Sequence, residues 1–368
     1  MSADLPDAWS SRFREALTHT EATHRTRVAR SVTARDGVRC EVDGQWVVNF
    51  CGNDYLGLAS RASNVTLDGA GSAHMVTGHF AEHDALIAEL CDWLGAEDGV
   101  LCGNGFVGNL AALSTLCGSG DLCVQDKLNH ASMLDALRSS QGTLARYPHA
   151  DVDAARQQFM RDVSGLRVLA TDSVFSMDGD LAPLQRLRSL CDEHDALMYV
   201  DEAHSVGVLG AGGEGVAPFA DLRLVTFGKA LGSFGAALLG GRDTIEYLRQ
   251  AARPLLFTTA LPPAIAKHVL DHVREIRRGE LTQRLKENRE YFAGLNVPGV
   301  MGGESAIFVK VIGDDGEAMA MSKSLLQKGL WVSAIRPPTV PEGSARMRLT
   351  LSALHTRAQI DQLADALQ

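Results

Sequence analysis

Short apolar runs alternate with helical segments through the middle of this 368-residue chain. The expected strands are 99–102, 122–125, 168–171, 197–200, 224–226 and 236–239. Helical patterns at 85–94, 110–117 and 184–194 lie between them. Strands that are apolar on both faces and separated by helices form parallel sheets with helices on both sides. The alternation therefore predicts an α/β fold with a mainly parallel sheet.

The two ends of the chain differ from this central region. Residues 8–30 read as a basic helix without a large core face, which would pack on another part of the protein or another subunit. Asp43-Gly44 predicts a hairpin turn within 37–50. Pro262-Pro263 opens a helical stretch that runs to about Leu295 and leads into a smaller α/β domain. Because the length exceeds one compact core, we expect an amino-terminal helical and β segment (1–50), a large domain (51–260) and a small carboxyl-terminal domain (261–368).

Composition excludes several classes of protein. The 35 basic and 45 acidic residues give a net charge of -10, which disfavours nucleic acid as a partner. No apolar run approaches the roughly 18 residues of a membrane span, and Met1 to Asp7 lacks the regions of a signal peptide. The seven cysteines are odd in number and form no CxxC pair. We therefore expect a cytoplasmic protein with reduced cysteines, no metal site and no membrane contact.

An acid, an imidazole and a lysine follow two of the expected strands. Asp201 ends the run 197–200, His204 comes three residues later, and Lys229 follows Thr226 in a glycine-rich turn. Open α/β sheets bind ligands at the carboxyl ends of their strands. A carboxylate there can pair with a protonated pyridine nitrogen, and a lysine amine can form a Schiff base with an aldehyde. The set therefore predicts pyridoxal 5'-phosphate (PLP) as the cofactor.

Two motifs allow other interpretations. Gly103 to Gly108 has the G-x-G-x-x-G spacing after an expected strand, and Asp126 follows at the distance of a ribose-binding acid, so an NAD-dependent dehydrogenase is the alternative from another enzyme class. That interpretation gives Lys229 no role, and a phosphate at a helix start accounts for the glycines equally well. Asp201 to His204 also matches a helicase acidic box, but no G-x-x-x-x-G-K-[ST] loop occurs. The coincidence of all these groups at strand ends favours PLP.

From about Arg27 to its end, the chain resembles the α-oxoamine synthase family of PLP-dependent enzymes. The segments that carry the resemblance are NDYLGL at 53–58, LNHAS at 128–132, VFSMDG at 174–179, DEAH at 201–204, TFGK at 226–229 and IRPPTVP at 335–341. The resemblance implies the aspartate aminotransferase-like fold and a homodimer with shared active sites. The last segment is associated with the branch that joins L-alanine to a pimeloyl thioester of coenzyme A or acyl carrier protein, with loss of carbon dioxide, in biotin biosynthesis.

The resemblance also implies a role for each residue of the site. Lys229 would bind the cofactor aldehyde and later move the substrate's Cα proton, while Asp201 would pair with the pyridine nitrogen. His204 would contact the phenolic oxygen, and His130 would stack on the ring and lie beside the substrate. Further cofactor contacts would come from Gly105, Phe106, Ser176, Thr226 and, across the dimer interface, Thr259. Substrate contacts would come from Arg348 and Asn53 at the amino-acid carboxylate and from Arg27, Arg336 and Thr339 on the acyl side.

The chain departs from the family pattern in places. The segment from Ala59 to Thr77 is shorter than usual near the active-site entrance, which would alter substrate range, and Asn104 replaces an expected serine. A sister enzyme that joins glycine to an acetyl thioester, glycine C-acetyltransferase, is an alternative against which the segment 335–341 argues. A catalytically inactive partner of the same fold is another, but this chain keeps Lys229.

Overall fold

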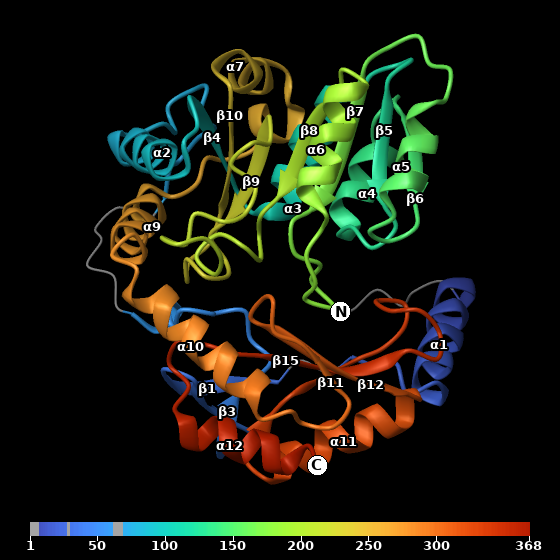
Figure 1. Ribbon diagram of the computed structural model, residues 1–368, viewed down its shortest axis with the longest axis vertical. Coiled ribbons are helices and arrows are strands. Elements are labelled where there is room, and N and C mark those ends of the chain that lie inside the picture. Colours follow the sequence, from blue (N-terminus) through green and yellow to red (C-terminus); the bar gives the residue numbers. More distant parts are fainter. Residues whose placement is uncertain (1–6, 28–29, 62–68) are drawn as a thin grey trace.

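The computed structural model describes residues 7–27, 30–61 and 69–368. Its large sheet, in the upper part of Figure 1, has the strand order β4-β10-β9-β8-β7-β5-β6. The neighbouring strands are parallel except β10, which is antiparallel to both β4 and β9. The predicted α/β class with a mainly parallel sheet is confirmed. The strands are β4 (Asp98–Cys102), β5 (Leu122–Asp126), β6 (Thr143–Tyr147), β7 (Arg167–Asp172), β8 (Leu197–Asp201), β9 (Leu222–Thr226) and β10 (Ala236–Gly240).

Both faces of this sheet are buried under helices. Successive residues of one strand pack into different apolar clusters, as Tyr199 and Val200 of β8 do, because side chains alternate across a strand. One cluster contains residues of α3 (Gly105–Leu116), α4 (Ala131–Arg138), α7 (Arg242–Ala251) and α8 (Arg253–Leu256). The other contains residues of α5 (Val152–Phe159) and α6 (Leu184–Glu193). Two-sided burial explains the continuous apolar runs of the sequence.

Two smaller sheets occupy the lower part of Figure 1. One has the order β1 (Val32–Asp36), β2 (Arg39–Val42), β3 (Gln45–Asn49), β13 (Leu330–Trp331), and the other β11 (Val300–Gly302), β12 (Ile307–Gly313), β15 (Ala345–Thr350), β14 (Ser333–Ile335). The predicted hairpin is present as β2 and β3. Because β3 pairs in parallel with β13, the amino-terminal strands share a sheet with the carboxyl-terminal part of the chain. The helices of this part are α1 (Asp7–Ala22), α10 (Glu280–Gly294), α11 (Asp315–Gln327) and α12 (Arg357–Ala366).

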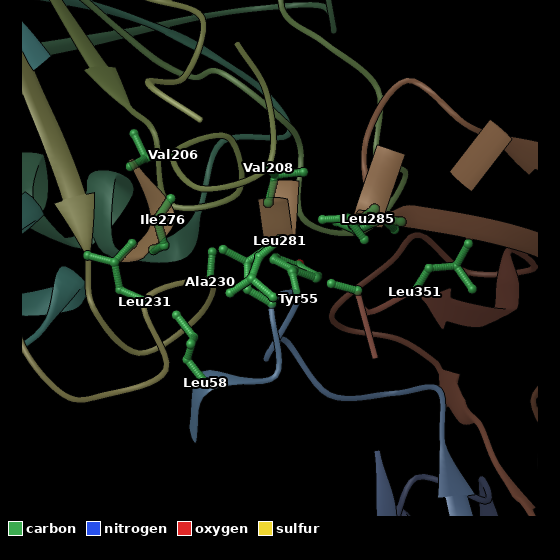
Figure 2. Close-up of a cluster of buried hydrophobic side chains, with 14 of the residues drawn as sticks. Tyr55, Leu58, Val206, Val208, Ala230, Leu231, Ile276, Leu281, Leu285 and Leu351 are labelled. Carbon is green, nitrogen blue, oxygen red and sulfur yellow. The ribbon is translucent and has the colours of Figure 1, made fainter. Parts of the chain in front are cut away.

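A single apolar cluster joins the upper and lower parts. Figure 2 shows Tyr55 and Leu58 from the segment after β3 near Val206 and Leu231 of the large-sheet region, with Leu285 of α10. All of these side chains are buried. The cluster also includes residues of α2 (Ala81–Leu94) and α9 (Pro263–Ile276). The segment 50–58 is therefore fixed between the two parts of the molecule.

Several expected elements were wrong in their bounds. The helix expected over 8–30 ends at Ala22, and residues 28–29 lie outside the described part, as do 62–68 of the shortened segment. The long helix expected to Leu295 is two helices, α9 and α10, because Gly279 between them has a positive φ of 80°. Strand β6 was missed because it is a partly exposed edge strand with polar residues. In the part of the chain that the structure describes, no helix has the length and hydropathy to cross a bilayer.

Candidate active site

A cavity of about 300 Å³ lies where strands of the large sheet end. Asp172, Asp201 and Thr226, the last residues of β7, β8 and β9, all line it. These strands run in parallel, so their carboxyl ends meet at one edge. The cavity brings together the predicted residues Asn53, Gly105, Phe106, His130, Ser176, Asp201, His204, Thr226 and Lys229.

Asp201 has a defined partner on each carboxylate oxygen. Its Oδ2 accepts a hydrogen bond from Asn109 Nδ2 at 2.7 Å, and its Oδ1 accepts one from the Ala203 amide at 2.9 Å. Asn109 Oδ1 in turn accepts from the Tyr199 hydroxyl at 2.6 Å. Because Asp201 and Asn109 are almost fully buried, these hydrogen bonds hold the carboxylate in one orientation towards the cavity.

Lys229 is a partly buried residue on the turn after β9. Burial lowers its pKa below the ordinary 10.5, Asp201 and Asp172 act to raise it, and Arg348 lowers it further. The net direction is downward, which favours the uncharged amine. An uncharged lysine is the form that attacks an aldehyde and accepts a proton.

Asp172 is a second buried carboxyl beside Asp201. Its pKa is raised well above the ordinary value by burial and by the charge of Asp201. Its Oδ2 accepts a hydrogen bond from the His130 amide at 2.7 Å, which places His130 at the start of α4 and at the cavity. The raised pKa favours the protonated, uncharged form of the Asp172 carboxyl.

Asn109 and Asp172 are site residues that the sequence analysis missed. Asp172 is the last residue of β7, one position beyond the expected strand 168–171. Asn109 lies four positions after Gly105 and so on the same face of α3. Extending the strand by one residue would have found Asp172, whereas Asn109 could be recognised only from the spacing on the helix.

His204 is an uncharged imidazole that lines the cavity. Burial lowers its pKa well below 6.5, and Lys229, Arg348 and His130 lower it further. Its Nδ1 lies 2.7 Å from the hydroxyl oxygen of Tyr55. His130 also has a lowered pKa, first because of burial, and its ring lies edge-on to Phe106 with centroids 6.4 Å apart. Both imidazoles are therefore neutral near pH 7.

The amino-terminal end of α3 opens into the same cavity. Asn104 caps the helix by accepting from the Val107 amide at 2.9 Å, while the first amides of a helix have no partner within it. A Cβ on Gly105 would lie 2.5 Å from Thr226 Cγ2, so only glycine fits here. Thr226 Oγ1 is buried and has no hydrogen-bond partner among the described residues. Helix amides beside a free hydroxyl suit a phosphate group.

Among the described residues, Arg348 on β15 donates its hydrogen bonds to neutral groups. Its Nε donates to the Ser176 carbonyl at 2.6 Å, and both Nη atoms donate to Asn53 Oδ1 at 3.2 Å. The residue is only 6% exposed. A buried guanidinium held by carbonyl oxygens is suited to a carboxylate ligand, which would supply the missing charge.

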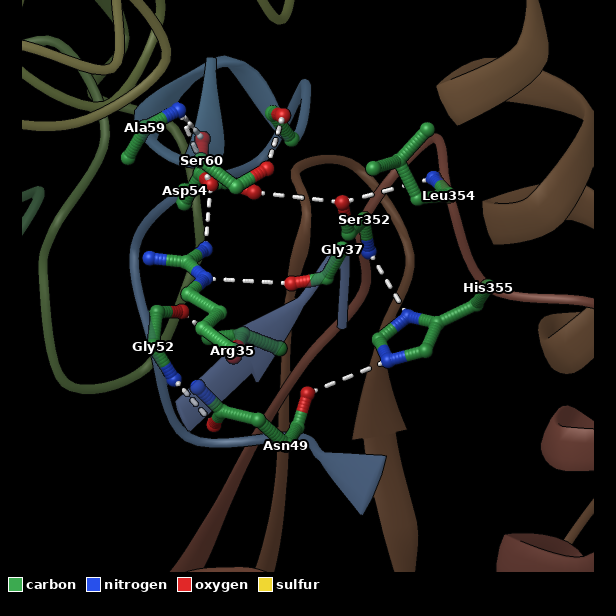
Figure 3. Close-up of polar contacts among 12 residues, drawn as sticks. Arg35, Gly37, Asn49, Gly52, Asp54, Ala59, Ser60, Ser352, Leu354 and His355 are labelled. Carbon is green, nitrogen blue, oxygen red and sulfur yellow. Dashed lines mark hydrogen bonds and ion pairs between the residues drawn. The ribbon is translucent and has the colours of Figure 1, made fainter. Parts of the chain in front are cut away.

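The segment that carries Asn53 is fastened by polar contacts on both sides (Figure 3). Asn49 Oδ1 accepts from the Gly52 amide at 3.0 Å, and Asp54 pairs with Arg35. His355 accepts from the Ser352 amide at 2.9 Å through Nδ1 and contacts the Asn49 carbonyl at 3.1 Å through Nε2. These contacts tie strands β1 and β3 to the chain after β15 and so fix Asn53 beside Arg348.

The residues predicted for the acyl side form a second, smaller cavity. Arg27, Arg336 and Thr339 line a space of about 70 Å³, where Arg27 Nη2 donates to Thr339 Oγ1 at 3.4 Å. Burial lowers the pKa of Arg336, and Arg27 and Arg25 lower it further. Thr259 borders neither cavity and is exposed. The structure therefore places the predicted residues in a main cavity, a basic cavity and an outer position, except Arg348, which is buried beside Asn53 and lines neither cavity.

Three histidines outside these cavities come close enough to suggest a metal site. One ring nitrogen from each of His74, His79 and His83 lies within 4.8 Å of the others. Both nitrogens of His83 are already engaged, Nδ1 with the Phe80 amide at 3.0 Å and Nε2 with the Leu261 carbonyl at 2.7 Å. Burial and the neighbouring His83 and His79 lower the pKa of His74 to about 4. We interpret the cluster as a structural network of hydrogen-bonded imidazoles.

The fold and the lysine-containing cavity are those of a transferase of the aminotransferase type. The chain matches the model of the family "Aminotransferase class I and II" over residues 46–367, and it belongs to this family. It is 48% identical to the 8-amino-7-oxononanoate synthase of Stenotrophomonas maltophilia, covering 94% of this chain and 90% of that protein. It is 47% identical to the enzyme of the same name from Xylella fastidiosa, covering 93% and 91%.

The solved structures agree with this assignment. A serine palmitoyltransferase structure with PLP as an internal aldimine superimposes with a TM-score of 0.91 at 25% identity, covering 99% of this chain and 98% of that chain. The resemblance to the α-oxoamine synthase family is thus confirmed, and with it the expectation of an enzyme acting on small molecules.

Proposed function

We propose that the chain is a PLP-dependent acyltransferase that condenses L-alanine with a pimeloyl thioester, forming 8-amino-7-oxononanoate, carbon dioxide and the free thiol. The proposal places it in biotin biosynthesis, with coenzyme A or acyl carrier protein as the thiol. The observation that carries it is one cavity holding Lys229, Asp201 and a helix start. The identity of 48% to an 8-amino-7-oxononanoate synthase over nearly the whole chain supports this choice within the family.

The residues of the cavity fit PLP group by group. The start of α3 and the unpartnered Thr226 hydroxyl would hold the phosphate, and Asp201 would pair with the ring nitrogen. His204 would face the phenolic oxygen, His130 the ring face, and Ser176 the ring edge. Bound PLP supplies an electron-accepting ring for the substrate carbon next to the amino group.

The chain's own residues would move the proton and bind the substrates. Lys229, whose pKa is lowered by burial, would release the cofactor aldehyde to the substrate amine and then take the Cα proton. Arg348 and Asn53 would hold the L-alanine carboxylate. Arg27, Arg336 and Thr339 would hold the distal carboxylate of the pimeloyl group in the basic cavity.

We also propose a homodimer, because Thr259 is exposed outside its own cavity, beside Phe257 with 73% exposure. Thr259 of one protomer would then reach the phosphate site of its partner. Sedimentation of the wild type and of Phe257→Glu tests this: a wild-type monomer that is fully active would contradict it.

A substrate comparison tests the reaction. The PLP-loaded protein is given L-alanine, glycine or L-serine, each with pimeloyl-CoA, with pimeloyl-acyl carrier protein or with acetyl-CoA, and products are identified by mass spectrometry. We expect 8-amino-7-oxononanoate from L-alanine and pimeloyl thioester alone. Preferential product from glycine and acetyl-CoA would favour glycine C-acetyltransferase. Reduction of NAD in a parallel reaction that contains it, without any condensation, would favour a dehydrogenase.

A further inference from the structure

Tyr55 lies between the imidazole of the main cavity and the residues that surround Arg348. It is only 1% exposed, and its ring belongs to the apolar cluster of Figure 2. Its hydroxyl oxygen is 2.7 Å from His204 Nδ1 and 3.2 Å from Asn53 Oδ1. Asn53 Oδ1 is also the acceptor for both Nη atoms of Arg348. One chain of hydrogen bonds therefore joins the imidazole, the phenol, the amide and the guanidinium.

The phenol has one hydrogen to donate and two acceptors within reach. Asn53 Oδ1 already receives two N–H groups from Arg348, each at 3.2 Å, which leaves it little acceptor capacity. His204 Nδ1 is the nearer acceptor, at 2.7 Å. The distance and the acceptor count both favour donation from Tyr55 to His204.

Donation to Nδ1 determines where the imidazole keeps its own hydrogen. His204 is neutral because burial, and after it the neighbouring Lys229 and Arg348 side chains, lower its pKa. A neutral imidazole carries one N–H and one lone pair. When the lone pair is on Nδ1, the N–H is on Nε2. Since Nδ1 faces Tyr55 and the residue lines the main cavity, Nε2 is the nitrogen available to a bound molecule.

We propose that Tyr55 is a positioning residue whose hydroxyl holds His204 in the Nε2–H tautomer, so that the imidazole acts as a hydrogen-bond donor in the main cavity. The tautomer is a property of the chain alone. Its use, donation to the phenolic oxygen of PLP, rests on the proposed function. A phenolate oxygen is an acceptor, so the opposite tautomer would present a lone pair to it and lose the contact.

Nuclear magnetic resonance of the PLP-free protein tests the tautomer directly. The chain is labelled with [15N]histidine, and long-range proton–nitrogen correlations distinguish Nδ1–H from Nε2–H imidazoles. His204 is assigned from the signal lost in His204→Gln. We expect Nε2–H in the wild type and a shift towards Nδ1–H in Tyr55→Phe. An Nδ1–H wild type, or an unchanged tautomer in Tyr55→Phe, would overturn the proposal.

Two further variants separate the hydrogen bond from general packing. Tyr147 is equally buried and its hydroxyl has no partner among the described residues, so Tyr147→Phe removes a buried hydroxyl elsewhere and should leave His204 unchanged. Asn53→Ala removes the competing acceptor and should leave the Nε2–H tautomer in place. Loss of that tautomer in Asn53→Ala would show that Asn53, and not Tyr55, sets it.

Kinetics of the PLP-loaded protein then tests the use of the tautomer. We expect kcat of Tyr55→Phe to fall about tenfold, as for the loss of one hydrogen bond, with a smaller change in KM for L-alanine and with a shifted absorption maximum of bound PLP. Tyr147→Phe should match the wild type. An effect on KM alone would contradict a role through His204. A wild type without any condensation activity would contradict the proposed function. The PLP-free measurement would still determine the tautomer of His204.

Discussion

Glu202 and Arg223 form an ion pair that is almost completely enclosed, with side-chain exposures of 0% and 4%. Glu202 Oε1 also accepts from the Val216 amide at 2.7 Å and the Ala217 amide at 3.1 Å. Arg223 Nη1 donates to the Leu94 carbonyl at 2.8 Å. The pair thus fastens the loop that follows Asp201 to strand β9 and to the end of α2.

Removing one member of this pair should lower the stability of the folded protein. Arg223→Leu leaves the Glu202 carboxylate buried without its partner, and we expect the free energy of unfolding to fall by about 3–5 kcal/mol. Urea denaturation followed by circular dichroism measures it. Arg156 pairs with Glu193 on the surface, so Arg156→Leu is the matched control and should leave the midpoint unchanged. Equal midpoints for both variants would argue against a structural role for the enclosed pair.

Arg348 should govern affinity for the amino acid. Arg348→Lys keeps the charge but loses the fork that contacts Ser176 and Asn53, and a hydrogen bond to a charged group contributes about 1.5–3 kcal/mol. We therefore expect KM for L-alanine to rise by roughly tenfold to a hundredfold, with the affinity for PLP little changed. Steady-state kinetics and PLP titration by fluorescence measure the two quantities. A variant with normal KM and weakened PLP binding would indicate that Arg348 contacts the cofactor instead of the amino acid.

Lys229 should react with PLP at a lower pH than an ordinary lysine. Because burial lowers its pKa below 10.5, the reactive amine is present at lower pH, and the rate of covalent attachment should decline only as pH falls through the lowered value. Stopped-flow absorbance of the PLP-free protein at increasing pH measures this rate. Lys229→Ala should show no attachment and no turnover, whereas Lys267→Ala, at an exposed lysine paired with Asp271, should behave as the wild type. Covalent attachment in Lys229→Ala would contradict the assignment.

His355 should make stability depend on pH below neutrality. Burial lowers its pKa from 6.5 to about 4, so below pH 6.5 the unfolded chain binds a proton that the folded chain does not. This contribution to stability is complete above pH 6.5 and is lost as pH falls towards 4, by about 2 kcal/mol between pH 7 and pH 5. Urea unfolding at both pH values measures it. In His355→Gln this part of the change in unfolding free energy between pH 7 and pH 5 should be absent. An identical pH dependence in wild type and variant would exclude a contribution from His355.

The sequence was sufficient for the parts of the site that lie on neighbouring strands. Asp201 and Thr226 end β8 and β9, which pair in parallel, and a short apolar run followed by a polar residue predicts such a strand end. The placement of Lys229 follows from the same pattern. The break between α9 and α10 also has a sequence signal, because Gly279 follows two arginines. The helical pattern on both sides obscured this signal.

The positions of the other site residues depend on contacts between segments that are distant in the sequence. Arg348 lies beside Asn53 only because β15 packs against the segment after β3, and no local pattern of residues contains that pairing. The same holds for Tyr55, which belongs to a motif singled out in the sequence but whose contact with His204 spans two parts of the chain. Thr259, predicted from the resemblance to act across an interface, stays a prediction.

The parallel pairing of β3 with β13 has a consequence for how the chain matures. Val48 pairs with Leu330, and the Phe50 amide donates to the Trp331 carbonyl at 2.9 Å. The entire large sheet lies between these residues in sequence. As the chain leaves the ribosome, β3 has an unpaired edge until almost the last segment has been made. Asn53 and Tyr55, only a few residues beyond β3, therefore reach their final positions only after β13 has been made, and truncation before residue 330 would leave β3 without this partner and the cavity incomplete.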